Sequence, residues 1–135
     1  MPATSIRVTQ PRLLKETGRT LRKLGLSLSS SSSPSALTIT PYPASKSSII
    51  HRKVGPSHPP VPPLLVPTST SPIRNLSLLR KLAASAPGPF FATGKAGQIN
   101  AALFAAACLA PTHTKIRRAL HLFRSRQTQS VPQKP

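Results

Sequence analysis

The chain has 135 residues, with 19 Lys and Arg against a single acidic residue, and its formal net charge is +18. It contains 17 Pro, four Phe, one Tyr and no Trp, so few aromatic side chains are present to fill a large core. This composition is typical of disordered or conditionally folded chains, and its length allows at most one domain.

Catalytic chemistry is the first class of function that the composition argues against. General acid–base catalysis usually needs a carboxylate or a positioned histidine, and the single carboxylate side chain, Glu16, lies among basic residues. The four histidines are scattered and the one cysteine, Cys108, has no neighbours at zinc-ligand spacing. We therefore expect no enzyme activity, no cofactor, no metal and no small-molecule substrate.

The high positive charge indicates an anionic partner, because a compact monomer with this charge repels itself. An anionic membrane surface, nucleic acid and an acidic protein all meet that requirement. For the fold, we predict a mostly disordered, Ser/Pro-rich chain without a sheet, in which only a few short helices form. The predicted helices span about 12–26, 73–86, 98–110 and 114–125.

The N-terminal segment, residues 1–28, places basic residues between leucines. Leu14, Leu21 and Leu24 share one side of a helix, which predicts an imperfect basic amphipathic helix. Arg-rich, Ser-rich and acid-poor is also the composition of an organelle transit peptide, whereas a secretory signal needs an apolar stretch that does not follow here. We therefore favour a mitochondrial or other intracellular membrane surface over the nucleus, and do not expect secretion.

Residues 29–72 are rich in Ser and Pro, and their prolines exclude long helices. No partner strand is evident for short pieces such as 36–40, so we interpret the segment as a disordered linker. Lys53, Pro56 and Pro59 have the spacing of a basic residue before a Pro-x-x-Pro core, which SH3-type or WW-type domains bind. A stiff linker is the other interpretation of these three residues.

Residues 73–126 are predicted to form a small helical region, followed by a disordered tail at 127–135. Pro72 and Pro87 bound its first helix. The alanine-rich run 99–110 is shorter than the roughly 18 to 20 residues that span a bilayer, so we interpret it as a helix packed in a small core. A partially inserting membrane segment is the alternative. Cys108 lies in this run, where a buried thiol is expected.

The last predicted helix follows Pro111 and is basic on one side and apolar on the other. Together these patterns predict a small, basic, non-enzymatic accessory or interaction protein that is attracted to an anionic membrane surface and then buries helical apolar faces there. Its predicted cationic contacts are Arg80, Lys81, Lys115, Arg117, Arg118 and Arg124, and its predicted apolar anchors are Leu76, Leu79, Leu103, Phe104, Leu120 and Phe123.

Two other hypotheses stay open. The first is nonspecific RNA binding, which the charge favours and the shortage of base-stacking aromatic residues disfavours. The second comes from a codon bias: Ser, Pro, Thr and Ala are abundant, whereas Asp, Glu, Asn and Tyr, whose codons are adenine-centred, are nearly missing. That bias is expected of a reading frame that overlaps another gene, for example in a virus, or of an orphan product without a defined activity.

Overall fold

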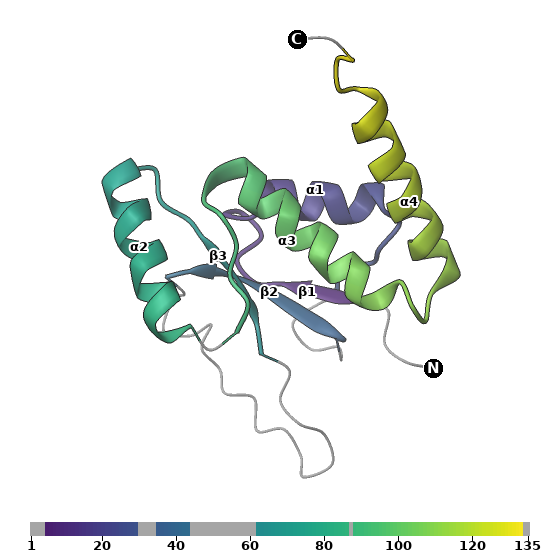
Figure 1. Ribbon diagram of the computed structural model, residues 1–135. Helices are drawn as coiled ribbons and strands as arrows, with labels where there is room; N and C mark the ends of the chain where they lie inside the picture. Colours follow the sequence, from purple (N-terminus) through teal and green to yellow (C-terminus); the bar gives the residue numbers. More distant parts are fainter. Residues whose placement is uncertain (1–4, 30–34, 44–61, 87, 134–135) are drawn as a thin grey trace.

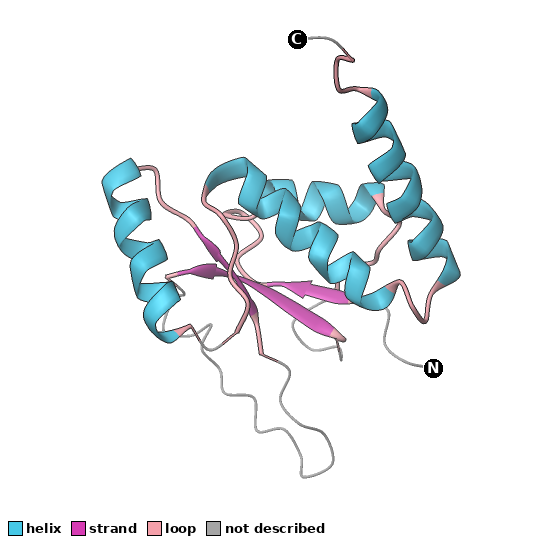
Figure 2. Cartoon of the chain, viewed as in Figure 1, coloured by secondary structure: helices cyan, strands magenta, loops and turns pink. Residues whose placement is uncertain are grey.

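The computed structural model describes residues 5–29, 35–43, 62–86 and 88–133, which form a parallel sheet and four helices (Figure 1). The sheet has three strands in the order β1-β2-β3, and the helices lie around it (Figure 2). The prediction of a mostly disordered chain without a sheet is therefore wrong. The elements are β1 (Ile6–Val8), α1 (Lys15–Lys23), β2 (Leu37–Tyr42), β3 (Leu64–Pro67), α2 (Pro72–Ser85), α3 (Gly94–Leu109) and α4 (Thr114–Gln129).

The middle strand, β2, lies in the stretch that the sequence analysis assigns to a disordered linker. It contains Pro41, which has no N–H to give to a sheet. The N–H of Thr9 donates to the Ile39 carbonyl at 3.0 Å, so Ile39, and Pro41 two residues further on, direct their backbone groups toward β1. The β1–β2 pairing ends at Val8 and Ile39. Pro41 therefore lies just past that pairing, where no donor is required of it.

The third strand, β3, accommodates a proline in the same way. The N–H of Leu65 donates to the Pro89 carbonyl at 2.9 Å, so Leu65 directs its backbone groups to the outer side of the sheet. Pro67, two residues on, shares that outward direction and ends the strand. Both prolines therefore occupy positions where the sheet needs no N–H donor. The prediction of a disordered linker rested on the proline content of this stretch, and it is wrong for that reason.

The core lies between the sheet and a layer made by α1 and α3, which pack against each other on one side of the sheet (Figure 1). The prediction that the alanine-rich helix packs in a small core is confirmed, because small side chains let α3 approach α1, β2 and β3 closely. The buried side chains of this core include Ile6, Leu14, Leu21, Ile39, Leu64, Val66, Ala101, Ala102, Ala105 and Ala106.

Two hydrogen bonds connect α1 to α3 across more than 80 positions of the sequence. The Thr17 hydroxyl donates to the Gln98 carbonyl at 2.8 Å, and the Glu16 N–H donates to the Gln98 side-chain oxygen at 3.1 Å. Gln98 thereby satisfies an N–H group in the first turn of α1 that no intrahelical carbonyl can reach. Removal of residues 1–28 as a targeting segment would take β1, α1 and these bonds out of the core.

The helix boundaries differ from the predicted ones for local reasons. α1 ends at Lys23, because Gly25 adopts φ +73° and closes the helix. The N–H of Leu26 donates to the Leu21 carbonyl at 3.0 Å, and that of Gly25 to the Arg22 carbonyl at 3.0 Å, which is the Schellman pattern of a glycine stop. At the other end of the chain, α4 continues to Gln129, into the predicted tail.

Candidate functional site

α2 is a peripheral helix that packs against β3 through Leu78 and Leu82, both buried (Figure 1). Its start is well defined: Pro72 occupies the first turn, and the Ser71 hydroxyl accepts a hydrogen bond from the Arg74 N–H at 3.5 Å. The two buried leucines lie four residues apart and so share one side of the helix. The opposite side of α2 is left open to solvent.

That open side, the α2 outer face, combines large aliphatic side chains with basic ones. Ile73 is 84% exposed and Leu76 is 53% exposed, and the two lie three residues apart on the same side of the helix. Arg74 and Lys81 are exposed at its edge. At about 100° per residue, the face spans an arc of about 120°. It consists of Ile73, Leu76, Ser77, Arg80, Ala83 and Ala84, all exposed.

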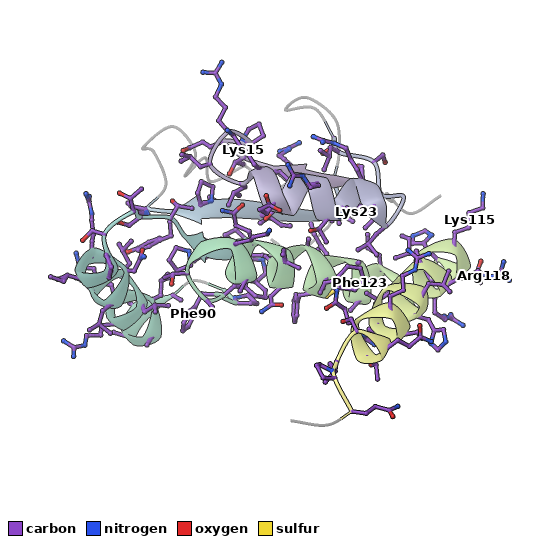
Figure 3. All side chains as sticks on the ribbon, turned by 90° about the horizontal axis from the view of Figure 1, so that it is seen from above. Lys15, Lys23, Phe90, Lys115, Arg118 and Phe123 are labelled. Carbon is purple, nitrogen blue, oxygen red and sulfur yellow. The ribbon has the colours of Figure 1, made fainter. Side chains whose placement is uncertain are left out.

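α4 also has two distinct sides. Ile116 and Leu120 are buried in the core cluster, and Phe123 is partly buried against it. Leu122 is 48% exposed on the outer side of α4. Figure 3 shows Lys115 and Arg118 of α4 pointing away from α3. The structure therefore separates two leucines that are only two residues apart.

Arg117 has a structural role that the sequence did not reveal. Its Nε donates to the Ala110 carbonyl at 3.3 Å, and its Nη2 donates to the Pro111 carbonyl at 2.9 Å. These carbonyls lie at the C-terminal end of α3, where the helix dipole favours a positive charge. Arg117 thus fixes the turn between α3 and α4, and this leaves its guanidinium less able to contact an external anion.

An open groove of about 370 Å³ runs between α3 and α4. Arg124 and His121 are among its lining residues, and both are exposed. The lining residues are Ala107, Ala110, Pro111, Arg117, Leu120, His121 and Arg124.

α3 presents a narrow exposed stripe that carries no charge. Phe104 is 42% exposed and packs edge-to-face on Phe91, with ring centroids 5.5 Å apart. Cys108 follows four residues later and is exposed, so the expectation of a buried thiol is wrong. Leu103 is partly buried against the core.

The predicted site residues differ in how far the fold exposes them. Leu76, Arg80 and Lys81 lie exposed on or beside the α2 outer face, whereas Leu79 is half-buried. Leu120 is enclosed in the core. Lys115, Arg118 and Arg124 are exposed on α4. The predicted proline motif of Lys53, Pro56 and Pro59 lies outside the described residues.

Sequence reasoning did not single out two exposed features. The first is the set of apolar side chains Ile73, Phe90 and Leu122, whose exposure depends on how each element packs. The second is the purity of the outer side of α1: a basic amphipathic helix was predicted in this segment, but not that each exposed residue of the helix is basic. Helical periodicity was the available signal for both, but it does not say how completely neighbouring elements cover each apolar side chain.

Two further findings concern the described part of the chain. None of its helices has the combination of length and apolar character that crossing a bilayer demands. Within residues 5–29, 35–43, 62–86 and 88–133, no group of three His, Cys, Asp or Glu side chains is arranged to hold a metal ion.

Comparison with known proteins found no match: neither a protein-family model nor a curated protein corresponds to this chain. The chemistry of the exposed surfaces therefore has to be inferred from their own residues.

Proposed function

We propose that this protein is a small, basic, non-enzymatic accessory protein that binds anionic membrane surfaces through the α2 outer face, with the exposed cations of α4 adding attraction. The observation that carries the proposal is the exposure of Ile73 and Leu76 beside Arg74, Arg80 and Lys81 on one peripheral helix. The only acidic residue of the chain is Glu16, in α1, so no carboxylate on α2 opposes an anionic surface.

Both parts of the α2 outer face contribute to the expected binding energy. Each Lys or Arg near an anionic lipid surface contributes about 1 kcal/mol, an attraction that salt screens. Ile73 and Leu76 together would add about 2 kcal/mol when their exposed portions leave water. Binding should therefore have a large salt-sensitive part and a smaller part that persists at high salt.

The aliphatic character of this face favours a membrane over RNA. Single-stranded nucleic acid is held by aromatic side chains on which bases stack, and Ile73 and Leu76 cannot supply that contact. Aliphatic side chains flanked by Arg and Lys match the composition of helices that lie in the membrane interface. A preformed α2 also spares the cost of folding a helix on the surface.

The test measures co-sedimentation of the full chain with vesicles of phosphatidylcholine and phosphatidylserine, and with phosphatidylcholine alone. The variant I73S/L76S should bind the anionic vesicles about 30-fold more weakly, since about 2 kcal/mol of apolar transfer is lost. The matched control is Leu13→Ser, a residue that is 49% exposed in the turn before α1. L13S should bind like the unmodified protein.

Two results would contradict the proposal. Equal losses for I73S/L76S and L13S would show that α2 is not the contact surface. Absence of binding to anionic vesicles by the unmodified chain would favour the hypothesis of an orphan product without a defined activity.

A charge test complements the apolar one: R74Q/R80Q/K81Q should weaken binding by about 3 kcal/mol at low salt and by much less at high salt.

A further inference from the structure

We infer that the outer face of α1 is a second binding surface, and that it takes the phosphate backbone of a nucleic-acid duplex. The basic α1 face consists of Lys15, Arg19, Arg22 and Lys23. These are the exposed residues of α1; Glu16 is half-buried, and the other four are buried. At about 100° per residue, the four cations fall within an arc of about 100°.

Three of the four cations on this face are available to a partner. Glu16 forms an ion pair with Arg19 at 3.1 Å, so the chain's single carboxylate neutralises one of the four cations. The chain has no second acidic side chain that could pair with Lys15, Arg22 or Lys23. Their mutual repulsion is relieved only by an external anion.

The face is also rigid, because the opposite side of α1 is built into the core. Leu14 and Leu21 are fully buried, and Thr17 and Glu16 bond to Gln98 of α3. Figure 3 shows α1, with Lys15 and Lys23 near its two ends, along one edge of the molecule, whereas Phe90 lies at the opposite edge beside α2 and α3. α1 and α2 therefore lie at separate places in the fold, as Figure 1 also shows.

The chemistry of the face selects the class of partner. A membrane surface would gain nothing apolar from it, because the exposed residues of α1 are all basic. Acidic protein partners usually supply contacts around a buried aromatic or aliphatic anchor, and single strands need stacking platforms; the face offers neither. A duplex backbone requires only a row of cations, since it carries about one charge per 1.7 Å of axis.

The dimensions fit that partner. The eight steps from Lys15 to Lys23 cover about 12 Å of helix axis, a length over which a duplex presents about seven phosphates. The three cations without an internal carboxylate partner would each neutralise one phosphate. Such contacts carry no base information, so binding should be independent of sequence and similar for RNA and DNA duplexes.

The test measures fluorescence anisotropy of labelled 20-base-pair duplexes of RNA and of DNA with the full chain over a range of salt concentrations. The variant K15Q/R22Q/K23Q should reduce the slope of log K against log salt by about 3, one for each phosphate that the variant leaves without a cation. Arg19 is retained because it pairs with Glu16. The variant R74Q/R80Q/K81Q removes the same charge from α2 and should leave the slope nearly unchanged.

Further variants protect the test against misfolding. Circular dichroism compares the helix content of each variant with that of the unmodified chain. The single substitutions Lys15→Gln and Lys23→Gln should each lower the slope by about 1, so the prediction holds even if the triple variant does not fold. K15R/K23R keeps both charges and should keep the slope.

Three outcomes would overturn the inference: equal slope losses for the α1 and α2 triple variants, no loss for the α1 variant, or binding of single-stranded RNA as tight as that of the duplexes. The first would assign the effect to net charge alone. Vesicle binding is measured separately and should survive K15Q/R22Q/K23Q, so failure of the duplex site is distinguishable from failure of the proposed membrane function.

Discussion

α1 and α2 are both short helices with exposed basic residues, but they differ in what lies beside those residues. The exposed residues of α1 are all basic, whereas α2 exposes Ile73 and Leu76 among its cations. They also differ in how they are held: α1 packs against α3 within the core layer, and α2 packs against β3 at the periphery. From this difference we infer that the neighbours of a cation, more than the number of cations, determine which anionic partner each surface would bind.

The largest expected effect comes from breaking each helix with a proline. Arg19→Pro places a proline inside α1, and Ser77→Pro places one inside α2; both positions are exposed, so the backbone change dominates. R19P should abolish cooperative unfolding, because a cost of about 3 kcal/mol or more falls on a helix that the core requires.

S77P should remove the helical signal of α2 and leave the cooperative transition of the remaining fold in place. Thermal denaturation followed by circular dichroism measures both variants. A cooperative transition retained in R19P would show that the fold does not need α1. A cooperative transition lost in S77P would show that the fold needs α2, and either result would contradict the comparison of the two helices.

The next effect compares how closely two buried glycines are packed, Gly97 in α3 and Gly18 in α1. A Cβ added at Gly97 would clash with the Ala92 carbonyl oxygen in the loop before α3, so Gly97→Ala should destabilise the fold by about 3 kcal/mol. A Cβ at Gly18 in α1 would meet nothing closer than the Arg22 side chain at 3.6 Å. Gly18→Ala should therefore stabilise the fold by about 0.5–1 kcal/mol, through helix propensity. Urea denaturation measures both values, and a stability loss in G18A as large as that in G97A would contradict this packing.

A third prediction converts the α2 outer face into a surface like that of α1. I73K/L76K replaces its two large aliphatic residues with cations and should remove the part of vesicle binding that persists at high salt, about 2 kcal/mol. At low salt the added charges offset this loss by about 1 kcal/mol each. Vesicle co-sedimentation over a range of salt concentrations measures the change. Persistent binding at high salt in this variant would show that the apolar contact lies elsewhere.

The smallest expected effect concerns the hydrogen bond between α1 and α3. Thr17→Val keeps the side-chain shape but removes the bond to the Gln98 carbonyl, which should cost about 1 kcal/mol. Ser77→Ala on α2 is the control, and as an exposed substitution it should change stability by less than about 0.5 kcal/mol. The difference in urea midpoint between the two variants measures the bond, and equal midpoints would show that it contributes nothing.

The helices were the predictable part of the fold because their signals are local. Each of the four predicted helices overlaps an observed one, and Pro72 and Pro111 mark a start and an end that the sequence displays directly. The sheet was not predictable in this way. Its pairings join residues far apart, such as Ile6 with Leu37, and the prolines of β2 and β3 resemble strand breakers until the direction of their backbone groups is known.

The exposed surfaces were only partly predictable, for a related reason. Helical periodicity places Leu120 and Leu122 on different sides of α4 but does not say which side faces the core, and the one predicted as an anchor is the buried one. For α1, the sequence predicts a basic amphipathic helix with Leu14 and Leu21 on its apolar side, and the structure adds that both leucines are buried in the core. Only the packing of the apolar side leaves the other side as a purely basic surface.

The most direct test of the two-surface account is flotation of anionic phosphatidylserine vesicles with the full chain and a labelled RNA duplex. Neither the vesicles nor the duplex attracts the other, so the duplex floats only if one protein molecule holds both. The account predicts that the duplex floats with the unmodified protein and stays behind with K15Q/R22Q/K23Q, while that variant itself still floats. Release of the protein from the vesicles as duplex is added would contradict the account, because it would show that both partners compete for a single surface.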